Sequence, residues 1–456
     1  MAYFPGISVG RAGGKNDQRS MLSATFISSN GVRRARTVIR TSFSRHEIRV
    51  NPEEGTAEID LVLDTGPLYH FDGVTIKGAE EYPPAFLRRY LGFHSGEIFS
   101  YAKLGQTQLN FLDSDRFKQV IVTPHEKSAE NLEVPVTIQL EPSLPKRLRP
   151  GIGYATDTGA RFSLRYKDVN AFHLGHELQG DFLIAQRKQT LAARYIIPNR
   201  KNVDSQTAFR LSYDQEEVDT YDSNTFSAEV EQIRSFGRGM IGSIYLRILR
   251  ETYTIGEENA TSLLVLPGVR FSRRRYNNNI RPEKGYFYSL ETRGTDHVLG
   301  SDVDLLQILA AGNTLIPLPA RLSLFLRTET GFTLQKQSLA DIPPSVRFFA
   351  GGDQSVRGYA YKSLGPKDEN GDVVGGKNLL VGSIELDRAL WAKWGVAAFY
   401  DAGNAFNDFG NFILRQGAGV GVRWYTPVGP VKVDLARQIG VKNPAYRLHV
   451  SIGFGW

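Results

Sequence analysis

The chain has 456 residues, a formal net charge of +7, 41% hydrophobic residues and no cysteine. Its length and apolar content suffice for two or three folded domains and exclude a disordered protein. Without cysteine there are no disulfide frameworks or thiolate metal sites, and the small, scattered positive charge argues against a nucleic-acid groove. No run approaches eighteen apolar residues, so a membrane helix is not expected, whereas a β-barrel crosses a bilayer without such a run.

Residues 1–65 form an atypical N-terminal region. Residues 1–26 show no charged start, apolar core and cleavage site of an export signal, so no signal peptide is visible and we expect a truncated, wrongly assigned or frameshifted start. Residues 46–52 and 56–64 alternate as two strands and match the last two strands of the unit that follows. We interpret this pair as the remnant of a preceding domain of the same kind.

Residues 66–146 predict a small α+β domain. The patterns indicate a strand, a proline-initiated helix, a second helix and two further strands at 73–77, 83–91, 101–112, 117–124 and 132–140. This β-α-α-β-β order packs two helices on a small sheet. It also leaves a sheet edge that can accept an extended segment of another chain.

From residue 147 to the end, nearly every segment alternates with period two. Near the middle of this region, Leu322, Leu324 and Leu326 share one face of a strand, whereas Arg327 and Glu329 lie on the other. A water-soluble sandwich buries the apolar face, whereas a membrane barrel turns it to lipid and keeps charges in a wet lumen. Three features favour the membrane barrel: the large number of predicted strands, the strands longer than ten residues, and the aromatic residues at the end of the chain. We predict an all-β antiparallel transmembrane barrel of about 16 strands.

A long loop, residues 335–377, carries the most informative motif. It contains Phe348-Phe349-Ala350-Gly351-Gly352 and Val356-Arg357-Gly358-Tyr359. The charge of an arginine cannot be removed or cheaply desolvated, so burying it requires a fixed carboxylate partner. Downstream, Glu385 and Asp401 alternate onto the polar faces of their strands, which predicts that both point into the lumen. We therefore expect Arg357 to be an internal tether.

This domain order and these motifs resemble the BamA/TamA superfamily of outer-membrane assembly barrels, in which the small α+β units are polypeptide-transport-associated (POTRA) domains. Within the superfamily, the size and the ending are most similar to TamA, the outer-membrane subunit of the translocation and assembly module. The resemblance implies that the loop folds into the lumen. The motif residues carried over are Phe348, Gly351, Gly352, Val356, Arg357, Gly358 and Tyr359, with Glu385 and Asp401 as tether partners.

The same resemblance implies location and partners. We expect the barrel in the outer membrane of a Gram-negative bacterium, surrounded by its lipid, with the N-terminal part in the periplasm. The expected partners are a TamB-like inner-membrane-anchored periplasmic protein and unfolded outer-membrane protein or autotransporter clients.

The seam between the first and last barrel strands is the predicted site of action. The first strand holds Pro150, Gly151 and Gly153, and the last holds Gly453 and Gly455 and ends at Trp456. Proline donates no ladder hydrogen bond and glycine weakens a strand, so the seam is expected to open easily. A client strand would then pair with this lateral seam by β-augmentation. Alternatively, the glycines only relieve crowding in the lumen.

The resemblance therefore implies a non-enzymatic outer-membrane insertase or translocase that assists the assembly and secretion of autotransporter-type β-barrel proteins. Two other functions stay open beside it. A two-partner secretion pore for a large adhesin shares the Arg-Gly-Tyr loop but usually adds an N-terminal plug helix, which the sequence pattern does not indicate. A passive porin-like barrel has no use for a POTRA-like domain.

Enzymatic chemistry is not expected. Gly6-Ile7-Ser8-Val9-Gly10 matches the nucleophile elbow, but that motif needs a preceding strand and a following helix, and neither pattern is present. The eight histidines form no ligand pair at metal spacing. We therefore predict no cofactor and no metal site.

Overall fold

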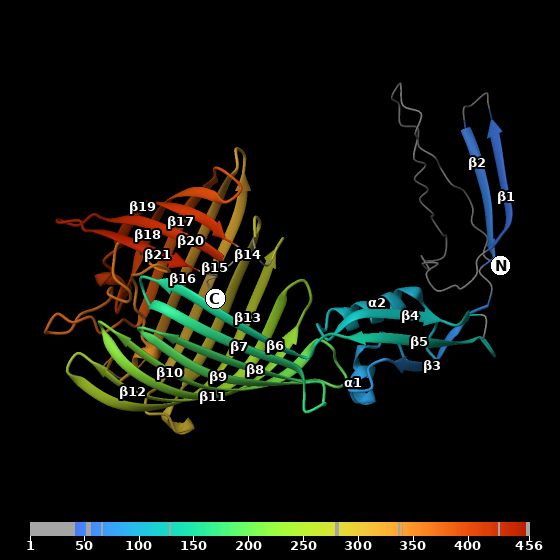
Figure 1. Ribbon diagram of the computed structural model, residues 1–456, viewed down its shortest axis with the longest axis horizontal. Coiled ribbons are helices and arrows are strands. Elements are labelled where there is room, and N and C mark those ends of the chain that lie inside the picture. Colours follow the sequence, from blue (N-terminus) through green and yellow to red (C-terminus); the bar gives the residue numbers. More distant parts are fainter. Residues whose placement is uncertain are drawn as a thin grey trace. The chain divides into compact units, whose positions relative to one another are not determined.

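The computed structural model describes residues 42–51, 56–64, 67–126, 129–278, 282–335, 338–339, 341–426 and 429–452. The chain divides into two units, residues 1–144 and 145–456, both rich in strands (Figure 1). The atypical start predicted for residues 1–26 lies outside the described ranges, as do Gly453, Gly455 and Trp456 at the predicted seam.

Across the described ranges, no helix is long and apolar enough to cross a lipid bilayer.

The first unit contains a strand pair and a small sheet. The pair is antiparallel and joins β1 (Ser42–Asn51) to β2 (Thr56–Asp64), where alternation predicted two strands. Its origin in a preceding domain stays a prediction. The rest follows the predicted β-α-α-β-β order, with β3 (His70–Lys77), α1 (Pro84–Leu87), η1 (Arg88–Tyr90), α2 (Tyr101–Leu112), β4 (Phe117–Pro124) and β5 (Glu133–Pro142).

The first predicted helix of this domain differs from expectation in its length. Pro83 and Pro84 begin it as predicted, since proline suits the first helical position. The α-helix covers only Pro84–Leu87 and then tightens into the 3₁₀ turn Arg88–Tyr90, because Leu91 is already extended.

Aromatic rings pack the segment between η1 and α2 against the sheet of this domain. The sheet order is β3-β5-β4, with β3 parallel to β5 and β4 antiparallel to it. Phe71 on β3 is fully buried, and its ring centroid lies 3.9 Å from that of Phe93 and 4.9 Å from that of Phe99. The segment carrying these two rings also covers the start of β3, because the amide of Phe71 donates to the carbonyl of Glu97. This segment therefore occupies part of the sheet edge at β3, an edge that was expected to be unpaired.

The second unit is a β-barrel. Within its described residues, sixteen strands form one closed antiparallel barrel in which the first strand, β6, pairs with the last, β21 (Figure 1). The strands are β6 (Lys146–Ala155), β7 (Gly159–Ala171), β8 (His176–Ala185), β9 (Lys188–Pro198), β10 (Ser205–Val218), β11 (Tyr221–Ser235), β12 (Met240–Ile255), β13 (Glu258–Tyr276), β14 (Gly285–Thr295), β15 (Leu305–Leu318), β16 (Leu322–Gln335), β17 (Asn378–Ala389), β18 (Trp394–Phe406), β19 (Arg415–Thr426), β20 (Gly429–Ile439) and β21 (Tyr446–Ile452).

The two faces of β17 identify the surroundings of the barrel. On β17, Leu380 and Ile384 are exposed on the outside, whereas Ser383 and Glu385 are buried on the inside. Exposed apolar and buried charged side chains are the reverse of the arrangement in a soluble sandwich. The predicted transmembrane barrel is therefore confirmed.

Candidate functional site

Arg357 is the centre of the site. It lies in the loop between β16 and β17, and only 5% of its surface is exposed. Its Nε and Nη2 atoms donate to the two carboxylate oxygens of Asp401 on β18, at 2.7 and 3.0 Å. Its Nη1 atom donates to Glu385 on β17 at 2.6 Å and to Asp434 on β20 at 3.0 Å. The structure thus brings Arg357 to both predicted carboxylates and to a third one.

Two further contacts fix the arginine. Its guanidinium carbon lies 3.4 Å from the ring centroid of Phe399, so the planar cation rests on an aromatic face. Its backbone amide donates to Asp401 at 3.0 Å. Main chain and side chain are both held, which places the loop tip as well as the charge.

A second buried arginine, Arg423 on β19, extends this network. Its Nη2 atom donates to the other oxygen of Glu385 at 2.8 Å, and its Nη1 atom binds Asp434. Glu385 and Asp434 therefore each bridge a barrel arginine and the loop arginine. In such a network, removing one member leaves buried charges unpaired, which costs more than the complete pair contributes.

Glycines let the loop tip approach the barrel wall. Gly351, Gly352 and Gly358 have φ angles of +99°, +106° and +96°, a region that residues with a side chain rarely adopt. On β19, a Cβ atom at Gly417 would lie 1.9 Å from the carbonyl oxygen of Arg357. Gly417 of β19 therefore makes room for the loop inside the lumen.

The remaining motif residues are apolar anchors. Phe348, Val356 and Tyr359 are buried in one cluster with Leu379 and Val381 of β17. A Cβ atom at Gly331 on β16 would lie 2.3 Å from the Phe348 ring, so this wall is also thinned to accept the loop.

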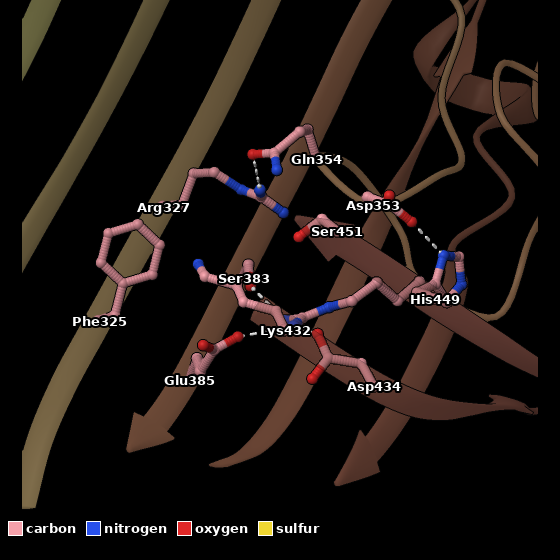
Figure 2. A pocket seen from close by; sticks show the side chains of 11 residues that line it. Phe325, Arg327, Asp353, Gln354, Ser383, Glu385, Lys432, Asp434, His449 and Ser451 are labelled. Atoms are coloured by element: carbon pink, nitrogen blue, oxygen red, sulfur yellow. Dashed lines mark hydrogen bonds and ion pairs between the residues drawn. The ribbon is translucent and has the colours of Figure 1, made fainter. Parts of the chain in front are cut away.

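A small cavity of about 90 Å³ lies beside Arg357 in the lumen. Figure 2 shows Glu385 and Asp434 on one side of it, with Arg327 and Lys432 close by. Arg327 also donates to Gln354 and to the carbonyl oxygen of Ser355 in the loop, both at 3.1 Å. The lumen around the loop is thus lined with charges that contact it directly.

The seam closes at the described ends of β6 and β21. Ser451 lies opposite Ala155, and Ile452 lies opposite Tyr154. Just beyond, the amide of Thr156 donates to the carbonyl of Val450 at 3.0 Å.

The predicted seam glycines of β6 face crowded surroundings. A Cβ atom at Gly151 would lie 2.6 Å from the hydroxyl of Ser163, and one at Gly153 would lie 2.7 Å from Nε of Arg161. The second would also lie 2.7 Å from the carbonyl oxygen of Ile452 across the seam. These close neighbours agree with the alternative that the glycines only relieve crowding in the lumen. A role of the glycines in opening the seam stays a prediction.

Several residues of the site were not predicted from the sequence. They are Ser383, Asp353, Arg423, Asp434, His449 and Asp157. Arg423 and Asp434 lie on the faces of their strands away from the apolar side chains of Trp424 and Leu435. The alternation therefore indicated that both charged side chains point into the lumen. It did not indicate the level within the barrel at which they lie, which depends on strand register. Asp157, Asp353 and His449 come together from three distant segments, which histidine spacing does not reveal.

Comparison with known families and proteins agrees with this architecture. The Omp85 superfamily domain matches residues 170–456, and the POTRA family, described as a surface antigen variable number repeat, matches residues 69–143. The outer membrane protein assembly factor BamA of Nitratidesulfovibrio vulgaris is 22% identical over 396 residues, which cover 83% of this chain and 50% of that protein. BamA of Neorickettsia risticii is 21% identical over 402 residues, covering 81% and 53%. The chain thus spans about half the length of these curated relatives.

Solved structures show the same fold at low sequence identity. The crystal structure of BamA from Haemophilus ducreyi lacking POTRA domains 1–3 has a TM-score of 0.74 at 17% identity, covering 92% of this chain and 90% of that one. CdiB from Acinetobacter baumannii has a TM-score of 0.59 at 15% identity, covering 90% and 78%.

Proposed function

Because this chain belongs to the Omp85 superfamily, we propose that it is a non-enzymatic insertase that helps β-barrel proteins to assemble in the outer membrane. It is an outer-membrane barrel protein whose POTRA part lies in the periplasm. Its clients would be unfolded outer-membrane proteins, including those of the autotransporter type. They would pair a strand edge with the seam between β6 and β21 and pass sideways into lipid.

The observation that carries the proposal is the loop held inside the lumen. Arg357 is bound by carboxylates of β17, β18 and β20, and the loop cluster around Val356 packs against the barrel wall. A folded segment fixed inside the lumen narrows the path for diffusion, which suits an open pore less well. A barrel that handles protein strands at its wall benefits from a fixed support inside.

A finer assignment within the superfamily is the TamA-type role. It rests on the resemblance in motifs and size, with a TamB-like inner-membrane-anchored protein as partner and autotransporters as preferred clients. The curated relatives compared above are BamA proteins, so the experiment has to separate a specialised role from a general one.

The test is gene deletion, followed by complementation with the parent gene or with a gene that carries Arg357→Ala. Autotransporter display at the surface and the abundance of other barrel proteins are measured together. Loss of display alone, restored by the parent and not by the variant, supports the TamA-type role. Loss of all barrel proteins supports a general assembly factor, loss of one large secreted protein supports a secretion pore, and no loss of either kind contradicts an insertase.

A further inference from the structure

A second set of loop contacts lies at the seam, separate from the Arg357 network. Asp353, which follows Gly352, accepts a hydrogen bond from the hydroxyl of Thr156 at 3.0 Å and contacts Nδ1 of His449. Its own backbone amide donates to Asp157 at 2.6 Å. Thr156 and Asp157 follow β6, whereas His449 lies on β21. Figure 2 shows the contact between Asp353 and His449. One loop residue therefore binds both sides of the seam.

Thr156 ties this contact to the closing ladder itself. Its hydroxyl oxygen also accepts from the amide of Val450 at 3.2 Å, while its amide donates to the carbonyl of Val450 at 3.0 Å. The hydroxyl that reaches Asp353 is thus part of the pairing between the two strands. Separation of the strands at this level would break the link between Asp353 and one of them.

His449 ties the same contact to the loop motif. Its Nε2 atom accepts from the backbone amide of Gly358 at 2.9 Å. Because an amide nitrogen only donates, Nε2 carries no proton and Nδ1 holds the ring proton of the neutral side chain. The Nδ1 proton is therefore donated to Asp353. One imidazole on the last strand links two points of the loop, before and after Arg357.

We propose that Asp353, Thr156 and His449 form a seam latch, which makes release of the loop tip and opening of the seam one coupled event. The inference goes beyond the proposed function, because the coupling is a property of the barrel alone and requires no client. Asp353 and its two partners are positioning residues in this role. Coupling of this kind is reciprocal, so a change on either side must be felt on the other.

The test uses the full chain in lipid nanodiscs with Tyr154→Cys and Ile452→Cys, two positions that face each other across the seam. The chain has no other cysteine, so oxidation yields one disulfide that locks the seam. Hydrogen exchange of residues 353–359, measured by mass spectrometry, reports on the loop tip. The amides of Asp353, Arg357 and Gly358 in this segment all donate to side chains.

In the parent barrel, the disulfide is expected to slow exchange of the loop tip at least fivefold. Asp353→Ala should speed exchange in the reduced barrel and abolish the response to the disulfide. Asp372→Ala is the matched control, since this exposed carboxylate in the same loop should leave the response unchanged. Thr156→Val keeps the shape of the residue and removes its hydroxyl, and it should weaken the response even if Asp353→Ala fails to fold.

Either of two results would overturn the latch. One is a parent loop tip whose exchange does not respond to the disulfide. The other is a folded Asp353→Ala or Thr156→Val barrel with the full parental response. Heat-modifiable mobility identifies folded barrels in each sample, so loss of coupling is distinguished from loss of structure.

Discussion

Replacing Arg357 with alanine removes the contacts that hold the loop tip. Four side-chain hydrogen bonds to carboxylates are lost, at distances between 2.6 and 3.0 Å. At about 1.5–3 kcal/mol for each bond to a charged group, their gross value is about 6–12 kcal/mol. The guanidinium regains its hydration on release, and Glu385 and Asp434 keep Arg423 as partner. A net cost of about 3–5 kcal/mol is therefore expected.

The cost should appear as release of the loop and leave the barrel intact. The sixteen-strand ladder within the described residues does not pass through the loop, so its hydrogen bonds survive. A cost of about 3–5 kcal/mol raises the open population between about a hundredfold and a few thousandfold. Amide exchange of residues 353–359 in nanodiscs measures this population directly.

Two matched variants sharpen the result. Arg357→Lys keeps the charge but loses the two-pronged contact with Asp401, so its exchange should fall between that of the parent and that of the alanine variant. Lys367→Ala removes an exposed cation of the same loop and should match the parent. If Arg357→Ala exchanges within tenfold of the parent, the carboxylate network does not hold the loop, and the reasoning fails.

Three further predictions follow from single contacts. Gly417→Ala places a Cβ where a loop carbonyl lies, so exchange of the loop tip should rise at least tenfold while mobility stays barrel-like. At the β6–β7 turn, burial and the nearby Asp353 carboxylate raise the pKa of Asp157 from 3.8 to about 7. The contribution of Asp157 to the stability of the loop contact is thus fully present below about pH 4 and is lost as pH rises through about 7. The exchange ratio of parent to Asp157→Asn, which cancels intrinsic pH effects, should rise from pH 5 to pH 8; a flat ratio would show that ionisation of Asp157 does not control the loop contact. Phe71→Ala should destabilise the POTRA domain by about 3–5 kcal/mol, seen as faster exchange of its sheet with barrel exchange unchanged.

The arrangement of elements was accessible from the sequence because it depends on local patterns. Period-two alternation predicted the barrel and the lumen-facing side of Glu385 and Asp401, and proline and helical spacing predicted the POTRA order. These signals come from neighbouring residues, so they survive without knowledge of the fold. The loop motif added Arg357 by resemblance and by the physical need of a buried cation for an anion.

Other features depended on register and were therefore hidden. Arg423 reaches both Glu385 and Asp434 only because β17, β19 and β20 are staggered so that these residues lie at one level. The role of Gly417 was hidden for a similar reason. The group that leaves no room for a side chain there is the carbonyl oxygen of Arg357, in a distant loop.

The sequence by itself determined the type of each strand, the face of each side chain and the need of Arg357 for a carboxylate partner. Only the tertiary structure decided that Asp353 lies between Thr156 and His449, because barrel closure brings together the first and last barrel strands, which are almost three hundred residues apart in the sequence. Alternation determines the face of a strand on which a side chain lies. Contact across the seam depends instead on the curvature and register of all sixteen strands together.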